Sequence, residues 1–199
     1  MLIEETNVPD AALPVAALKS HMRMGTGFAD DTLQDGVLGS FLRAAMAAIE
    51  ARTGKVLIER EFTFVVTGRR ADGAVVLPVA PVTVIAQVQL VSRSGVETDI
   101  SPEIFRLERD GHLPCLRAAG GTLPMPETGG ELRVQFLAGY GPEWDDVPAD
   151  MQQAVLMLAS HYYEYRHDTA LDGGCMPFGV TALIERFRML RLGRSGAQV

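Results

Sequence analysis

The feature that most constrains this chain is a double change in the period of its apolar residues. Residues 14–54 and 146–192 repeat apolar side chains every three or four positions, the period of a helix that buries one face. Residues 55–141 instead alternate apolar and polar side chains, as strands with one buried face do. We therefore expect one α+β domain over residues 1–199: a helical bundle of two N-terminal and two C-terminal helices, with an antiparallel β meander inserted between them.

Two helices are expected before the β region. The first covers residues 15–24, and the second covers residues 30–52. Gly54 follows the second helix, and glycine readily adopts the left-handed conformation that ends helices. The period of three and four residues predicts the buried stripe of the second helix as Leu33, Val37, Phe41, Ala44, Ala48 and Ala51.

Six strands are expected in the β region. Phe62, Phe64 and Val66 should face inward, and Glu61, Thr63 and Thr67 should face solvent. The stretch 111–130 contains five glycines and three prolines, so it is interpreted as a loop with brief edge pairing. The expected strands are residues 61–67, 74–77, 82–91, 96–100, 104–108 and 132–136.

Two helices are expected after the β region. Asp146 is the expected N-cap of a long helix that ends near His167, and Pro148 suits its first turn. The final helix should run from Pro177 or Phe178 to Leu192. The buried stripes are predicted as Met151, Val155, Leu158, Ala159 and Tyr162 in the long helix, and as Val180, Leu183, Phe187 and Leu190 in the final one.

Composition limits the class of protein. The chain has 199 residues and a net charge of −7, and no apolar run approaches the roughly 18 residues that span a membrane. Two cysteines cannot form a disulfide framework, which fits a cytosolic origin. Residues 176–199 carry four arginines and one glutamate, so this segment is +3 and the remainder −10. Such an asymmetry fits either a solvated helix end or an interaction surface.

No catalytic, cofactor or metal site is predicted. His161 and His167 lie about 120° apart around one helix and cannot share a metal. Cys115 and Cys175 have no CxxC spacing, and Gly25-Thr26-Gly27 lacks the context of a phosphate loop. The acidic group Glu143, Asp145, Asp146 and Asp150 lacks the alternating ligands and the glycine of a calcium loop, and two of its members serve as helix-start signals. The group Tyr162, Tyr163, Tyr165 and Arg166 is not interpreted as a nucleic-acid site, because Tyr162 belongs to the buried stripe and the acidic body would repel phosphate.

Three stretches of the chain together resemble a known protein family. The first is residues 18–24, with the following helix and its ending Ile49-Glu50-Ala51-Arg52-Thr53-Gly54. The second is Ala138-Gly139-Tyr140-Gly141, followed by residues 147–154 and 161–166. The third is Met176-Pro177-Phe178-Gly179-Val180 with the arginine-bearing end. In this order they resemble the head–tail connector (adaptor) proteins of tailed phages and of phage-like gene transfer agents.

The resemblance implies a structural role without enzymatic activity or cofactor. Such adaptors form a ring, commonly of twelve subunits, beneath the portal protein in the neck of a virion that is assembled in the bacterial cytoplasm. The ring extends the DNA channel without binding DNA specifically and is a platform for stopper and tail proteins. Residues 111–130 and the β meander are candidates for subunit or tail-side contacts. The C-terminal segment of relatives docks on the portal, which assigns portal binding here to Arg186, Arg188, Met189, Arg191, Leu192 and Arg194.

Two alternatives remain open at this point. A stopper or tail-completion protein would occupy the same neck at a lower position. A small hydrolase would use His161 and Glu164, which are neighbours at i and i+3 on one helix.

Overall fold

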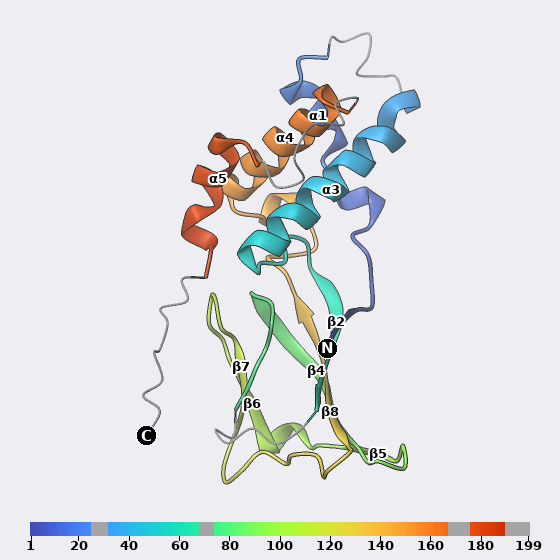
Figure 1. The fold of residues 1–199 in the computed structure, drawn as a ribbon, viewed down its shortest axis with the longest axis vertical. Helices are drawn as coiled ribbons and strands as arrows, with labels where there is room; N and C mark the ends of the chain where they lie inside the picture. Colours follow the sequence, from blue (N-terminus) through green and yellow to red (C-terminus); the bar gives the residue numbers. More distant parts are fainter. Residues whose placement is uncertain (25–31, 68–73, 167–175, 190–199) are drawn as a thin grey trace.

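The computed structural model describes residues 1–24, 32–67, 74–166 and 176–189. Helices gather at one end of the molecule, here called the helical end, and the sheets form the other, the β end (Figure 1). The fold class is therefore α+β, as the change of period predicts. The helical end contains the α-helices α1 (Val15–His21), α3 (Asp35–Thr53), α4 (Ala149–Glu164) and α5 (Phe178–Ile184), and the 3₁₀ turns η1 (Asp10–Ala12), η2 (Thr32–Gln34), η4 (Trp144–Asp146) and η5 (Glu185–Phe187).

The β end is antiparallel and consists of two sheets. The larger sheet has the order β1-β2-β8-β4-β5 and the smaller one β3-β7-β6. The strands are β1 (Leu2–Glu4), β2 (Arg60–Thr67), β3 (Ala74–Val76), β4 (Val82–Val91), β5 (Glu97–Asp99), β6 (Phe105–Glu108), β7 (Cys115–Ala118) and β8 (Glu131–Ala138), with the turn η3 (Pro102–Ile104) before β6.

Two strands depart from the expectation. β7 lies inside the stretch 111–130 and is the central strand of the small sheet, which is more than brief edge pairing. Its partners β3 and β6 lie on both sides of it, so its backbone is paired despite the surrounding glycines and prolines. β1 extends the large sheet by pairing with β2, and Ile3 and Gln135 flank Thr63 on neighbouring strands. For this reason Thr63, expected in solvent, is only 4% exposed.

The buried face of α3 also differs from the predicted one. Val37 is 48% exposed, and Ala44 and Ala51 are exposed as well, whereas Phe41 and Ala48 are half-buried. The side chain of Leu33 lies outside the described residues. The apolar residues of α3 occupy more than one face at helical spacing, and the face with the larger side chains packs inward. The buried residues of α3 are Leu38, Gly39, Leu42, Ala45, Met46, Ile49 and Thr53.

The C-terminal part of the helical end largely follows the pattern. In α4 the predicted stripe is buried, except that Tyr162 is half-buried. α4 packs against α1, α3 and α5 and is thus the centre of the bundle. In α5, Val180 and Ile184 are fully buried, whereas Leu183 is half-buried.

The interior consists of two separate apolar clusters. One fills the helical end and the other lies between the two sheets. The chain changes from one cluster to the other within two residues, since Val56 packs in the β cluster and Leu57 and Ile58 pack in the helical one. Residues 54–60 and 138–147 therefore form the junction of the two ends. There Glu59 N–H donates to Gly141 O at 2.8 Å, and Tyr140 N–H donates to Leu57 O at 3.2 Å.

A buried ion-pair network fastens this junction. Arg60, at the start of β2, is 8% exposed and donates to both carboxylate oxygens of Glu50 in α3 at 2.7 Å. It also donates to Glu4 of β1 at 2.6 Å. Glu50 accepts a further bond from the Leu57 N–H at 2.8 Å. Burial raises the pKa of Glu50, although Arg60 opposes the shift. The network therefore joins α3 to the sheet and keeps the charges of Arg60 and Glu50 largely away from water, while Glu4 is partly exposed.

Replacing Arg60 with methionine should destabilise the protein strongly, because Glu50 would remain buried without its cation. We expect Arg60→Met to lower the free energy of unfolding by about 3–5 kcal/mol, measured by urea denaturation. Arg133→Met is the matched control: Arg133 pairs with Glu97 and Glu131 on the more exposed outer face, so its loss should cost about 1 kcal/mol or less. Equal losses in the two variants would contradict the assigned role of the network.

Candidate functional site

The segment expected to contact the portal begins at α5. The Met176–Val180 motif has a structural explanation in three of its residues. Pro177 precedes the helix, Val180 is fully buried, and Gly179 lies so near Met157 that a Cβ atom there would be 2.8 Å from the Met157 Cε. Phe178, in contrast, is 87% exposed. The motif thus seats α5 on α4 and leaves one aromatic ring in solvent.

The final helix is shorter than expected. α5 ends at Ile184, η5 follows it, and Arg188 is extended, with φ −72° and ψ 139°. A 3₁₀ turn has three residues per turn, so it places Ile184 and Phe187 on one side, and both pack against the helical core. The prediction of one helix to Leu192 is therefore wrong for the described residues.

Three of the six predicted portal-binding residues lie in the described part of the chain. Arg186 pairs with Asp150 of α4 at 2.9 Å and lies over the Phe187 ring, 4.6 Å from its centroid. Arg188 pairs with Glu185 at 2.9 Å, and Met189 is half-buried. The remaining three, Arg191, Leu192 and Arg194, lie outside the described residues. The two described arginines are thus held by carboxylates of their own chain and remain partly exposed.

The Ala138–Gly141 motif lies at the junction of the two ends. Gly139 has a φ of 144°, and a Cβ atom there would overlap the backbone of Glu59. At Gly141, a Cβ atom would overlap the carboxylate of Asp146. That carboxylate accepts from the Glu143 N–H at 3.0 Å, as half of a capping box at the start of η4. Both glycines are therefore required by close contacts within the junction.

Asp146 does not cap α4, contrary to the expectation. The N-cap of α4 is Pro148, whose ring has no atom that can accept a hydrogen bond from the helix. The Asp146 carboxylate instead accepts from the Glu143 N–H. The first turn of α4 is instead tied to η4 by Gln152, whose Nε2 donates to Trp144 O at 2.9 Å and to Val147 O at 3.0 Å. Of the acidic group near this turn, Asp150 pairs with Arg186 and Asp145 is exposed.

Adding one methyl group at Gly141 should disrupt η4. We expect Gly141→Ala to lower the free energy of unfolding by about 1–3 kcal/mol, because the Asp146 carboxylate must leave the capping box. Gly36→Ala on α3 is the matched control, since no atom lies within 4 Å of its added Cβ and alanine favours a helix by about 0.5–1 kcal/mol. Thermal denaturation of both variants measures the difference; a Gly141→Ala protein as stable as the control would refute this explanation.

The contacts of the candidate catalytic residues His161 and Cys115 are typical of residues with a structural role. The His161 ring lies 4.7 Å from the Tyr165 ring, and within the described residues it forms no hydrogen bond with Glu164. Cys115 is buried and its thiol donates to Glu108 at 3.2 Å, while burial raises the pKa of that thiol. A raised pKa keeps the thiol protonated and weakly nucleophilic. His167, Cys175 and residues 25–27 lie outside the described residues.

The aromatic cluster of α4 belongs to the packing of the helical end. Tyr163 meets Phe41 edge to face, with ring centroids 6.1 Å apart, and donates its hydroxyl to Gln34 at 3.1 Å. Arg166 lies over the same ring at 4.4 Å. Among the described residues no group of His, Cys, Asp and Glu could hold a metal ion, and none of the helices formed by these residues is long and apolar enough to cross a membrane.

A buried lysine fixes the turn between β6 and β7 to the junction. Lys55 is 3% exposed, donates to the Gly111 carbonyl and lies 3.1 Å from His112 Nδ1. Burial lowers the pKa of Lys55. Asp110 accepts from the N–H groups of His112 and Leu113 at 2.7 Å, and these bonds lower the pKa of its carboxyl group. The expected loop is thus held at its first residues by polar contacts.

Two features of the structure are not predicted from the sequence: the ion pairs of Arg60 and the exposure of Phe178. The motif around Glu50 is recognisable, but nothing in its spacing identifies Arg60 or Glu4 as partners. Phe178 belongs to a recognisable motif as well, and its apolar character would by itself suggest burial. Neither feature has a local sequence signal. The ion pairs of Arg60 join residues 10 and 56 positions apart in the sequence, and the exposure of Phe178 depends on the absence of a neighbour among the described residues.

Comparison with known proteins identifies the family. No protein-family model and no curated protein matches the chain. A chain in the neck of an empty gene transfer agent (GTA) particle, computed with C6 symmetry, is 48% identical, with all of both chains covered and a TM-score of 0.88. A chain from the virion of a native GTA particle is 47% identical, with 98% of each chain covered and a TM-score of 0.86. A third, from the neck of a native GTA particle computed with C12 symmetry, is 43% identical over all of both chains, with a TM-score of 0.84. This protein therefore belongs to the head–tail connector family of structural, non-enzymatic proteins represented in the necks of GTA particles.

Proposed function

We propose that this protein is the head–tail adaptor of a phage or phage-like particle. Copies of the chain form a ring beneath the portal, extend the DNA channel and provide the platform for stopper and tail proteins. The observation that carries the proposal is the full-length similarity to a neck chain in a particle computed with C12 symmetry. The adaptor would be part of the virion and would join it during assembly in the bacterial cytoplasm.

The symmetry of the related neck supports a ring of twelve subunits. In a cyclic ring each subunit contacts its two neighbours through two different surfaces, because the same head-to-tail contact is repeated around the symmetry axis. Each chain contributes a net charge of −7, and a ring of such chains presents negative charge to the DNA inside it. We expect this charge to limit adhesion while DNA passes, since the phosphate backbone is itself negative.

Portal binding is assigned to the C-terminal segment on three grounds. It is the one strongly basic part of an acidic chain, it follows α5 at the helical end, and it combines arginine with Met189 and Leu192. Arginine and methionine are enriched at protein interfaces, and a basic patch suits an acidic rim on the partner. Arg186 and Arg188 already meet carboxylates of their own chain. The assignment is tested at Arg191 and Arg194, the other two arginines of the segment.

Charge reversal in this segment should prevent attachment to the portal. We expect Arg191→Glu/Arg194→Glu to reduce co-sedimentation with portal-containing particles at least ~tenfold, because repulsion replaces attraction at the contact. Arg52→Glu/Arg106→Glu makes the same change in net charge at two exposed arginines elsewhere and should attach normally. Deleting residues 175–199 would be a poor test, because Val180 and Ile184 are buried in the helical core.

Imaging of the neck distinguishes the adaptor from its alternative. An adaptor would form the layer directly beneath the portal, whereas a stopper or tail-completion protein would lie below that layer. Normal attachment of the Arg191→Glu/Arg194→Glu variant would move the portal contact to another surface. A chain found only in a lower layer of the neck would refute the adaptor role.

A further inference from the structure

Phe178 is the most exposed of the large apolar side chains in the described residues. Its exposure is 87%. It is the first residue of α5, and the helix is held firmly behind it by the burial of Val180 and the contact of Gly179 with Met157. An aromatic side chain on a fixed helix loses little conformational freedom when a partner covers it. Phe178 therefore has the properties of an interface anchor.

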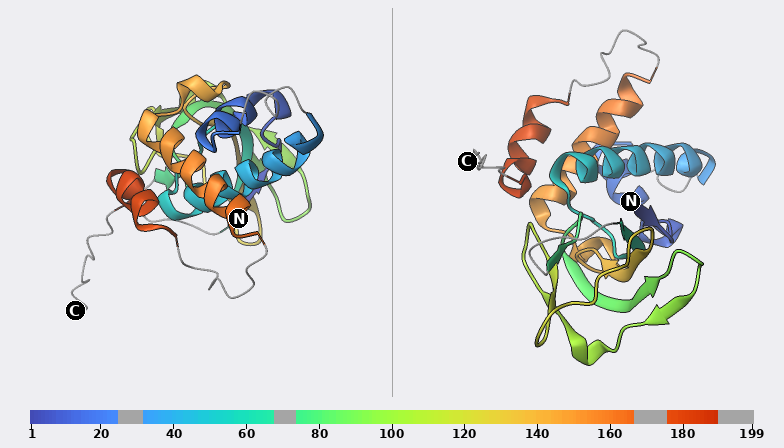
Figure 2. Two further views of the ribbon diagram at one scale, coloured as in Figure 1. Left: turned by 90° about the horizontal axis from the view of Figure 1, so that it is seen from above. Right: turned by 60° about the horizontal axis from the view of Figure 1, so that its bottom comes forward.

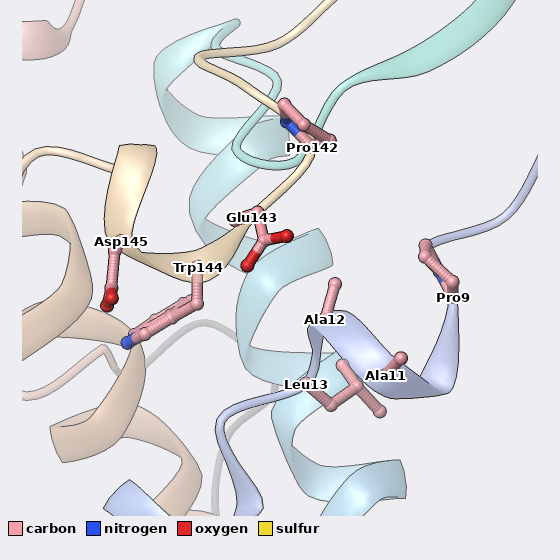
Figure 3. A pocket seen from close by; sticks show the side chains of 8 residues that line it. All are labelled: Pro9, Ala11, Ala12, Leu13, Pro142, Glu143, Trp144 and Asp145. Atoms are coloured by element: carbon pink, nitrogen blue, oxygen red, sulfur yellow. The ribbon is translucent and has the colours of Figure 1, made fainter.

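A hollow elsewhere on the helical end has the size to accept such a ring. It lies between η1 and η4 and has a volume of about 300 Å³. A cavity of about 150 Å³ already admits benzene. Six of the residues that line it have apolar side chains and two have carboxylates, and polar atoms form the larger part of its surface (Figure 3): Pro9, Ala11, Ala12, Leu13, Pro142, Glu143, Trp144 and Asp145. The capping box between Glu143 and Asp146 keeps one wall in place.

The ring and the hollow lie on different sides of the bundle. α5 is at the left of α4 in Figure 1, whereas the blue segment that contains η1 is at the right of α3. The view from above in Figure 2 shows the same separation. α5 packs against α4, and none of its residues lines the hollow. Phe178 therefore cannot fill the hollow of its own chain.

We propose that Phe178 of one copy inserts into the hollow between η1 and η4 of the next copy around the ring. This inference rests on the proposed ring and names the contact that closes it. A projecting ring on one side and a receiving hollow on another form a heterologous contact, the type that generates a cyclic ring. Both features belong to the helical end. The ring would meet the apolar side chains of this hollow, with the Glu143 carboxylate beside it (Figure 3).

Disulfide trapping in assembled particles tests the contact directly. The background is Cys115→Ser/Cys175→Ser, and Ala182→Cys/Ala11→Cys adds one thiol on each side of the proposed interface. Ala182 is exposed and lies one helical turn after Phe178, so the Phe178 ring is kept. We expect oxidation to produce a ladder of covalent multimers on a non-reducing gel. Ala182→Cys/Ala51→Cys is the control with its second thiol at an exposed residue of α3 that does not line the hollow, and it should produce no ladder, as should each single-cysteine variant.

The outcomes separate this contact from the ring itself. Imaging of the same particles shows whether the neck contains a ring of this protein. A ring without a ladder would overturn the contact and leave the proposed function intact, whereas the absence of a ring would overturn both. A disulfide between the thiol introduced by Ala182→Cys and a different neck protein would also overturn the contact.

Substitution of each side should have the same effect. Phe178→Ala removes the projecting ring, and Ala11→Trp fills the hollow of the neighbour. Because both residues are exposed, the thermal stability of the free protein should be unchanged, while incorporation into particles should fall roughly tenfold or more. Val37→Ala, at a 48% exposed residue of α3 that does not line the hollow, should incorporate normally. Normal incorporation of Phe178→Ala would refute the anchor role.

Discussion

The salt bridge between Arg60 and Glu50 is the interaction on which the shape of this protein depends. Its two apolar clusters are separate, so hydrophobic packing alone does not fix one end of the molecule against the other. Arg60 joins the last turns of α3 to the first residue of β2, and through Glu4 it includes the N-terminal strand. Loss of either partner of such a pair destabilises the protein, because each charge is tolerated in the interior only while the other is present. The orientation of the β end beneath the helical end is thus set by a few polar groups.

The period of the apolar residues predicts the elements of this fold better than their faces. β4 has the predicted bounds, 82–91, but its predicted inner face is interrupted: Val84 is 49% exposed, and the pairing with β8 shifts register on both sides of it. α3 contains Val37, Ala44 and Ala51 on one face and Leu38, Leu42 and Ile49 on another, all at helical spacing. Only contact with α4 decides which face is inside. β7 is not predicted for a similar reason, since its stability comes from β3 and β6 and not from its own composition.

The surfaces relevant to assembly are less accessible to sequence reasoning. The glycines of the Ala138–Gly141 motif can be recognised, yet their cause is the backbone of Glu59 and the carboxylate of Asp146, which no local pattern reveals. The basic character of the C-terminal segment is visible in the sequence, but the pairing of Arg186 with Asp150 is not. Family resemblance therefore supplies the role, and the structure supplies the contacts through which individual residues can serve it.

The division of the interior into two clusters has an evolutionary consequence. Substitutions or insertions in the turns of the β end, such as those around Val96 and Gly121, meet few atoms of the helical cluster. Natural selection can therefore remodel that end for a new neighbour while the helical end keeps its own packing. A connector built in this way can change one end in evolution without losing the packing of the other. Only residues near Arg60, where the two clusters meet, are constrained by both.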